Sequence, residues 1–360
     1  MASAIDFSQL TFTDEQIRDL KELLFDSIVE AEDFGKFHTV VPGIVSGKEI
    51  GYVGEFGLVG KAGQGCDPTP DTFRLGITKK IWDPQVWEII RDECFTDLEN
   101  TMAVYAKKVG TEEADLTGTA YMMMVEEKLK TAIKKMLWRL SWFSDEDHAN
   151  VSDSPAGVIT DGVDVDYFNV IKSGYWKQLF AIAATDSDRR VTIAANSQST
   201  KALQFSTLTP TLADGYLQSL VYGAAPELRQ QKNKIGLVTR SILDKVEQFI
   251  TGQGLQPLYE NSVNGFDFGA PGLKRHGVTW FPIDVWDEII LAYFSDGTKL
   301  YRPHRAVLTT PDNLMVGVPS TEIIEHFDSF FDKRSRKNRI EARDKMDPKI
   351  SIDKLTQVAF

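Results

Sequence analysis

Residues Val278–Pro319 read VTWFPIDVWDEIILAYFSDGTKLYRPHRAVLTTPDNLMVGVP. The stretch opens with alternating β-forming residues around Trp280, and a turn signal, Ser-Asp-Gly-Thr, follows at 295–298. A second β-rich run covers 306–310, and a Pro-Asp-Asn corner then leads into Leu-Met-Val-Gly at 314–317. Branched and aromatic residues at a period of two, punctuated by Gly, Pro and Asp, predict sheet rather than helix. The stretch contains no catalytic triple. We therefore expect this half of the chain to have a structural rather than a catalytic role.

The composition is that of a chain able to build a sizeable core. It has 360 residues, of which 42% are hydrophobic, so we expect two domains or one elaborate α+β unit. No apolar run approaches the roughly 18 residues of a spanning helix. The start, MASAIDFSQL, lacks the basic and apolar regions of a signal peptide. The only cysteines, Cys66 and Cys94, predict no disulfide framework, fit a reducing cytoplasm and are expected to be buried.

The sequence carries no recognisable catalytic or ligand-binding motif. Its five histidines are scattered, and HExxH, GxSxG and CxxC patterns do not occur. The run GKAGQG at 60–65 departs from phosphate-binding patterns, because Gly54 lies one residue too far away and Ala62 replaces the required hydroxyl. The net charge of -12 argues against a general nucleic-acid binder. We therefore predict no catalytic residue, no cofactor and no metal site.

An acidic stretch at 145–166 leaves one alternative open. It is rich in aspartate, but Asp161–Asp166 lacks the register and the terminal Glu of a calcium loop. A solvated loop is the favoured interpretation. The alternative, from a different functional class, is a metal-dependent hydrolase that uses this cluster.

The N-terminal part predicts a helix followed by an extended excursion. Thr13 and Gln16 form a capping box, and the helix should end near Gly35. Its apolar face consists of Ile17, Leu20, Leu24 and Ile28. Nine glycines then fall between Gly35 and Gly65. Because glycine permits unusual backbone angles but offers no side chain to pack, this segment is predicted to be an extended loop or irregular hairpin, with Ile77–Ile81 as its returning strand.

Two helices are predicted next. Asp83-Pro84 is a helix start, with Asp as N-cap and Pro as the first helical residue, and Gly110 is the end. The apolar face between them is Trp87, Ile90, Cys94, Leu98, Met102 and Tyr105. At 1.5 Å per residue this helix would be about 35–40 Å long, suitable for a spine. The second helix has the face Met122, Val125, Leu129, Ile133, Met136 and Leu140.

Later segments predict smaller elements. Asp166 should cap a short helix that contains Trp176, a helix should follow around Leu212–Tyr222, and Ile235–Thr239 should be a central strand. Lys333–Lys345 gathers seven basic residues. Two interpretations of this basic segment stay open: a solvated hairpin, or an ion-pair surface between subunits.

Three stretches resemble the major capsid proteins of tailed phages, particularly those that infect Bacteroides-like hosts. The first is HRAVLTTPDNLMVGV at 304–318. The second is DYFNVIKSGYWKQLFAIA at 166–183, followed by VTIAAN at 191–196, and the third is the ending, 331–360. The first 160 residues resemble such proteins in the order of their predicted elements more than in their amino-acid sequence.

The resemblance implies an α+β fold of the Hong Kong type. Its parts would be an N-terminal arm and helix (1–34), an extended loop (35–81), a spine helix with a peripheral domain (82–205), an axial domain (206–325) and C-terminal strands that return to the peripheral domain (326–360). It also implies a non-enzymatic function: self-assembly, as hexamers and pentamers, into the icosahedral head that encloses double-stranded DNA. An acidic subunit is compatible with this function, because such a shell contains DNA without gripping it.

The resemblance further implies partners and contact residues. Expected partners are other copies of the chain, a portal and a scaffolding protein; we expect no sequence-specific DNA contact, no membrane, assembly in the host cytoplasm and a final place in the virion. The closest rival is the encapsulin nanocompartment, which shares this fold and binds cargo peptides. Expected intersubunit contacts are Gly43, Lys48, Tyr52, Phe56 and Lys61 in the extended loop, Phe12, Leu20 and Leu24 in the arm, and Arg334, Arg336 and Arg339 in the basic hairpin.

The N-terminal segment also predicts how assembly proceeds. Residues 1–34 are too short for a large built-in scaffolding domain. We therefore expect scaffolding to be separate or absent, and the subunit in particles to keep its N-terminus.

Overall fold

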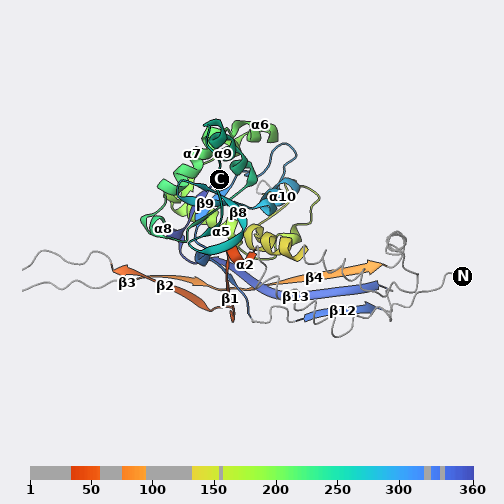
Figure 1. Ribbon diagram of the computed structural model, residues 1–360. Coiled ribbons are helices and arrows are strands. Elements are labelled where there is room, and N and C mark those ends of the chain that lie inside the picture. The colour runs from red at the N-terminus through yellow and green to blue at the C-terminus, as the bar shows by residue number, and fades with distance from the viewer. Residues whose placement is uncertain (1–33, 57–74, 95–131, 154–156, 320–325, 333–336) are drawn as a thin grey trace, which may run out of the picture.

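The computed structural model describes residues 34–56, 75–94, 132–153, 157–319, 326–332 and 337–360. A rounded body of helices around a sheet stands on an elongated layer of strands, and a hairpin projects from one end of that layer (Figure 1). Within the part of the chain that the structure describes, no helix combines the length and apolar character needed to cross a bilayer.

A mixed seven-stranded sheet forms the centre of the body. In spatial order its strands are β5 (Arg190–Val191), β14 (Gln357–Ala359), β10 (Ala306–Thr309), β6 (Ile235–Val238), β9 (Val278–Pro282), β8 (Phe266–Arg275) and β7 (Tyr259–Val263). The β6–β9 and β14–β5 pairs are parallel, and the other pairs are antiparallel. The predicted strand at Ile235–Thr239 is confirmed, and it is central.

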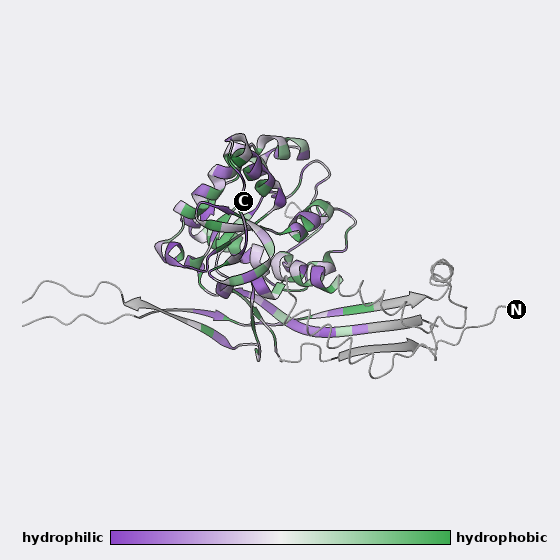
Figure 2. Ribbon diagram, viewed as in Figure 1, coloured by the Kyte–Doolittle hydropathy of each residue, from purple (hydrophilic) through white to green (hydrophobic). Residues whose placement is uncertain are grey.

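The inner strands β10, β6 and β9 are buried on both faces, which explains their continuous apolar sequences. Leu237 and Phe281 face one core, and their neighbours Val238 and Trp280 face a second. The helices α7 (Pro210–Tyr222) and α9 (Arg240–Gly252) cover the second core. The first core is covered by α5 (Tyr175–Thr185), α10 (Asp284–Tyr293) and the helical residues 132–143. Figure 2 shows the apolar faces of these helices turned towards the sheet.

A five-stranded sheet forms the elongated layer. Its strands are β1 (Thr39–Val41), β11 (Leu314–Gly317), β13 (Lys337–Ile350), β12 (His326–Asp332) and β4 (Gln85–Cys94). The long β13 pairs with β12 and β4 along its first part and with β11 at its end. Strands β12 and β13 thus lie in this layer, whereas β14 lies in the body.

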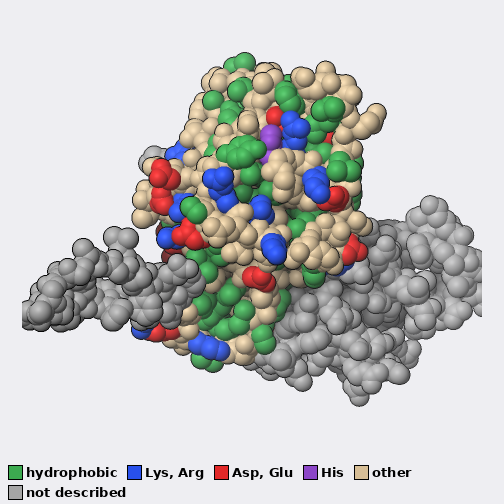
Figure 3. All heavy atoms as spheres, turned by 60° about the vertical axis from the view of Figure 1, so that its left-hand side comes forward, with side chains coloured by type: hydrophobic (Ala, Val, Ile, Leu, Met, Phe, Trp, Pro, Cys, Tyr) green, Lys and Arg blue, Asp and Glu red, His purple; other side chains and the backbone are tan. Residues whose placement is uncertain are grey.

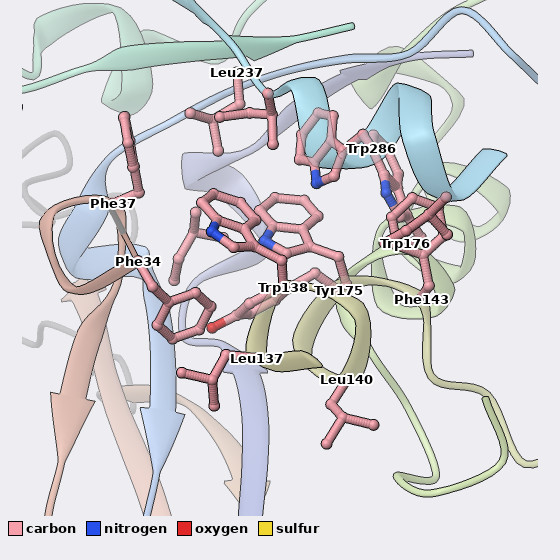
Figure 4. Packing of buried hydrophobic residues seen from close by; sticks show 14 of the residues in the cluster. Phe34, Phe37, Leu137, Trp138, Leu140, Phe143, Tyr175, Trp176, Leu237 and Trp286 are labelled. Atoms are coloured by element: carbon pink, nitrogen blue, oxygen red, sulfur yellow. The ribbon is translucent and has the colours of Figure 1, made fainter. Parts of the chain in front are cut away.

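The first core connects the body to the layer. It holds a group of tryptophans, in which the rings of Trp142 and Trp286 lie 4.5 Å apart and those of Trp176 and Trp286 lie 4.9 Å apart (Figure 4). The same cluster includes Val316 of β11 and Ile350 of β13. One continuous core therefore holds the two sheets together.

Shorter elements complete the described chain. They are β2 (Glu49–Phe56) and β3 (Leu75–Ile81), which pair only with each other, the helices α2 (Phe34–Phe37), α6 (Lys201–Thr207) and α8 (Pro226–Gln230), and the 3-10 turns η3 (Val165–Tyr167), η4 (Ser187–Arg189), η5 (Ala194–Ser197), η6 (Pro311–Asn313) and η7 (Asp353–Leu355). The predictions of a returning strand at Ile77–Ile81 and a helix at Leu212–Tyr222 are confirmed.

The helix predicted from Asp83 is wrong over Gln85–Cys94, which form strand β4 instead. Trp87 is buried, whereas its neighbour Val86 is 37% exposed and Ile90 is 53% exposed. This is the alternation of a strand, stabilised by ten paired positions along β13. The rest of the predicted helix lies outside the described residues.

Two further predictions are wrong. The sequence 284–293 forms the helix α10, although the surrounding stretch predicted sheet. Trp286, Ile289 and Ile290 recur at helical spacing and are buried together, so tertiary packing favours the helix. Asp166 does not cap the helix that contains Trp176, because that helix, α5, begins at Tyr175 with Gly174 as its N-cap. A side-chain cap occurs earlier, where Asp164 accepts a hydrogen bond from the amide of residue 166 before η3.

Candidate assembly surfaces

The structure describes some of the predicted contact residues. Gly43, Lys48, Tyr52 and Phe56 lie at the base and on the first strand of the β2–β3 hairpin, and Arg339 lies on β13. Outside the described residues are Phe12, Leu20, Leu24, Lys61, Arg334 and Arg336.

The loop before the hairpin is exposed and tightly turned. Gly43 adopts a φ of 70°, a left-handed conformation that favours glycine. The Lys48 ammonium donates a hydrogen bond to the Gly43 carbonyl at 3.2 Å. Val45, between them, is 63% exposed. This loop therefore offers an apolar tip and a positive charge to the surroundings.

A buried tryptophan fixes the base of the hairpin. Trp82 is 2% exposed, its amide donates to the Lys48 carbonyl at 2.9 Å, and its carbonyl accepts from the Gly47 amide at 2.9 Å. The indole packs so closely on Gly317 of β11 that a Cβ added there would lie 2.6 Å from the ring. The direction in which the hairpin leaves the layer is thus set by close packing.

Charged groups reinforce this base. Lys80 donates to the carbonyl of Ile350 at 2.6 Å and pairs with Asp353 at 2.5 Å. The Asp83 amide donates to the buried carboxylate of Asp347 at 2.8 Å. These contacts join β3 and Asp83, two residues beyond its end, to the last residues of β13 and to the turn that follows β13.

A second lysine lies on the other side of the base. Lys172 lies 2.6 Å from Asp83, and this hydrogen bond holds the pKa of the Asp83 carboxyl below its usual range. Burial raises the pKa of Asp347, although the Lys349 ammonium lies 3.2 Å from its carboxylate. The ammonium groups of Lys172 and Lys349 thus offset the negative charges of Asp83 and Asp347.

Among the residues that the structure describes, the strands of the hairpin pair only with each other. Tyr52 pairs with Thr78 and Phe56 pairs with Leu75, with a register shift between them. Each strand therefore has one edge whose backbone groups are available for another chain. Figure 3, which looks onto the side of the molecule nearest the hairpin, shows apolar side chains gathered at the foot of the body.

The layer on the other side presents a second open surface. The backbone of Arg339 in β13 pairs with Phe330 of β12 on one side and with Asp92 of β4 on the other. On the outward face of β4, Val86 and Ile90 are exposed. An apolar strand face next to a basic strand can contact a neighbouring protein.

The acidic stretch considered as a metal site contains an ion-pair network instead. The Lys177 ammonium lies 2.5 Å from Asp145 and 2.7 Å from Asp147, and its hydrogen bond lowers the pKa of the Asp147 carboxyl. Within the described ranges, no three His, Cys, Asp or Glu side chains gather as they would around a metal ion. A lysine thus occupies the position that a cation would take among these carboxylates.

Sequence reasoning missed the residues that hold the base of the hairpin. Trp82, Lys80 and Lys172 were not singled out, and Asp83 was assigned to a helix start. The bond between Asp83 and Asp347 spans 264 positions. The one local signal was a tryptophan directly before an Asp-Pro pair, and this pattern is compatible with several different structures.

No protein-family model matches the sequence, and no curated protein matches it. Among solved structures, the chain is similar to a chain of the satellite phage P4 procapsid including size determination (Sid) protein, with a TM-score of 0.51, 9% identity and coverage of 94% of this chain and 98% of that one. It also matches a chain of Mycobacterium phage Bobi (TM-score 0.47, 8% identity, coverage 90% and 88%). A third match is the holo-SrpI encapsulin complex from Synechococcus elongatus (TM-score 0.45, 8% identity, coverage 91% and 86%).

Proposed function

Because the chain has the Hong Kong-type fold of phage capsid proteins, we propose that it is the major capsid protein of a tailed phage. It assembles into the icosahedral head shell that encloses the double-stranded DNA genome. The observation that carries this proposal is the β2–β3 hairpin, whose base is fixed by Trp82 while its strands project without a further strand partner in the described part of the chain.

A projecting hairpin supports assembly for a physical reason. A two-stranded ribbon is only marginally stable in water, so it gains order when another surface covers it. In a shell that surface is the neighbouring subunit, which Gly43, Lys48, Tyr52, Phe56 and Lys61 contact in this proposal. The arm residues Phe12, Leu20 and Leu24 and the basic residues Arg334, Arg336 and Arg339 contact neighbours as well.

The proposal extends to the other partners. Subunits form hexamers and pentamers in the host cytoplasm, with a portal and a separate scaffolding protein, and the product is the virion. The net charge of -12 is compatible with containment of DNA without sequence-specific binding. In this proposal the function is structural rather than enzymatic. The chain divides into arm, loop, peripheral and axial parts at the bounds predicted from the sequence. Its proposed relatives are phages of Bacteroides-like hosts.

The test shortens the hairpin without touching its base. Tyr52 and Thr78 are opposite each other in the register, so residues 53–77 can be replaced by an Asn-Gly turn. Gly47, Lys48 and Lys80 stay in place. Full-length and shortened chains are purified, and their assembly is followed by electron microscopy and sedimentation.

We expect closed shells from the full-length chain, and a folded but unassembled subunit from the shortened chain. A full-length chain that stays monomeric at high concentration and in particles from infected cells would refute the proposal. Unfolding of the shortened chain would assign the hairpin to the subunit core instead. Shells filled with a cargo protein rather than DNA would identify a nanocompartment.

A further inference from the structure

A polar pocket of about 600 Å³ opens on the body, between the segment around β5 and the loop after α10. Arg190 and Thr192 of the segment around β5, Ser197 of η5, and Arg302 and Phe360 line it. Its volume is in the range of small-molecule sites, which is about 300–1,000 Å³. The pocket lies on the body, away from the β2–β3 hairpin.

Two guanidinium groups in this pocket lack an acceptor. Arg190 lies 4.5 Å and Arg302 lies 4.4 Å from the centre of the Phe360 ring. Among the residues that the structure describes, no oxygen accepts a hydrogen bond from either side chain. Contact with the same ring holds both guanidiniums at this pocket, and their N–H groups have no acceptor within the described residues.

The two like charges are not neutralised nearby. Burial and the neighbouring Arg190 both lower the pKa of Arg302, which indicates a cation held where it lacks a counter-charge. Asp296 lines the same pocket, but its carboxylate accepts hydrogen bonds from the amides of Thr298 and Lys299, and the hydrogen bond from the Lys299 amide in particular lowers its pKa. The pocket therefore has an excess of positive charge.

The backbone that presents Arg302 is held in an unfavourable conformation. Its φ is 49°, which costs free energy for a residue with a side chain. Buried Arg305 holds this turn, because its guanidinium donates to the carbonyls of Arg302 at 2.8 Å and Tyr301 at 3.0 Å. The Arg302 guanidinium is thus held against the Phe360 ring, at a cost that other residues compensate.

We propose that this pocket binds the phosphate group of a small molecule between the guanidiniums of Arg190 and Arg302. A guanidinium presents paired N–H donors whose spacing matches two oxygens of a phosphate. The hydroxyls of Thr192 and Ser197 line the same pocket and supply further donors. This site is additional to the shell function, and it requires no second subunit.

The test is titration of inorganic phosphate and pyrophosphate into the unassembled full-length chain, followed by calorimetry. We expect saturable binding with one site per chain, weakened at least tenfold by Arg190→Gln and by Arg302→Gln. Arg190 is exposed, so Arg190→Gln leaves the fold intact even if Arg302→Gln disturbs it. Arg229→Gln, an exposed arginine of α8 outside the pocket, is the matched control and should bind like the wild type.

Two results would overturn the proposal. The first is the absence of saturable binding by the wild type. The second is equal affinity of the wild type and Arg190→Gln. Because the unassembled chain is measured, either result leaves the proposal of shell assembly untouched.

Discussion

At the scale of single residues, buried amide side chains join segments that are far apart in sequence. Asn313, in the Pro-Asp-Asn corner, accepts from the Ile352 amide at 2.7 Å and donates to the carbonyls of Ile352 and Leu355. Asn196 accepts from the His304 amide at 3.0 Å and donates to its carbonyl at 2.8 Å. The stretches that carried the resemblance therefore satisfy one another's backbone groups.

Two glycines predict opposite effects of the same substitution. A Cβ at Gly236 in β6 would lie 2.1 Å from the buried Trp280 ring, whereas a Cβ at Gly215 in α7 meets nothing within 4 Å. Gly236→Ala should lower the free energy of unfolding by about 1–3 kcal/mol through overpacking. Gly215→Ala should raise it by about 0.5–1 kcal/mol, because glycine is unfavourable in a helix. Urea denaturation measures both; equal effects would contradict the close packing of Gly236 on Trp280.

A buried histidine predicts loss of stability in acid. The indole N–H of Trp142 donates to His38 Nε2 at 2.9 Å, so the proton of the neutral ring is on Nδ1, which donates to the Phe34 carbonyl at 2.8 Å. Burial lowers the pKa of His38 to about 3. Because this value is below that of the unfolded chain, the stability contribution is complete above about pH 6.5 and is lost as the pH falls.

Between pH 6.5 and 5, His38 alone should remove about 2 kcal/mol from the free energy of unfolding. His38→Phe keeps the ring in place but cannot be protonated, so its stability should fall less steeply over this range. Denaturation at several pH values measures the slope. The variant is less stable at pH 7, because Trp142 loses its acceptor, and so the slope rather than the absolute value is compared. Identical slopes would show that His38 does not titrate there.

At the scale of elements, the error in β4 shows what a periodic pattern leaves undecided. Trp87, Ile90 and Cys94 recur at helical spacing, yet Trp87 and Ile89 face the core and Ile90 faces outward. The run Val86–Ile90 contains several β-branched residues, and the pairing that decides the matter comes from β13, about 250 positions later. Local patterns found β6, β9 and β10, three of the seven strands of the body, but they could not give their partners.

Substitution along β4 distinguishes the strand from a helix. Trp87→Ala should destabilise the subunit by about 3–5 kcal/mol, because it removes a large buried ring. Ile90→Ala should change stability by less than about 0.5 kcal/mol in the unassembled chain, since its side chain faces outward. In a helix the two residues would share one face and both substitutions would be costly. Chemical denaturation of the two variants decides between these structures.

Other elements show where sequence prediction succeeded and failed for the candidate site. The glycine-rich composition of 35–65 predicted an extended segment, and β2 fulfils this over Glu49–Phe56. The base of that hairpin was not predictable, because its contacts join residues that are far apart in the sequence and meet only when the chain is folded. Trp82 packs on Gly317, and Lys80 pairs with Asp353. The helix α10 was missed since Trp286 and Ile290 suit a strand as well as a helix.

At the scale of the whole molecule, the body and the layer form one unit. Their common core includes residues of both sheets, and polar contacts cross the same boundary. Tyr175 of α5 donates its hydroxyl to the Met315 carbonyl in β11 at 2.8 Å. Gln178, one turn further along α5, donates to the carbonyl of Pro348 at 2.7 Å and accepts from the Ile350 amide at 3.0 Å. The body and the layer therefore keep a fixed relative orientation.

This coupling predicts a single unfolding transition and a specific sensitivity at Gln178. Tryptophan fluorescence reports on the common core, far-ultraviolet circular dichroism reports on all elements, and the two should give the same midpoint in urea. Gln178→Met keeps the length of the side chain but leaves backbone groups of β13 without a partner, so stability should fall by about 2–3 kcal/mol with both probes still coincident. Gln218→Met, at an exposed position of α7, is the control and should have little effect. Separate midpoints for the two probes in the wild type would mean that body and layer unfold independently. The inference that they keep a fixed relative orientation would then be wrong.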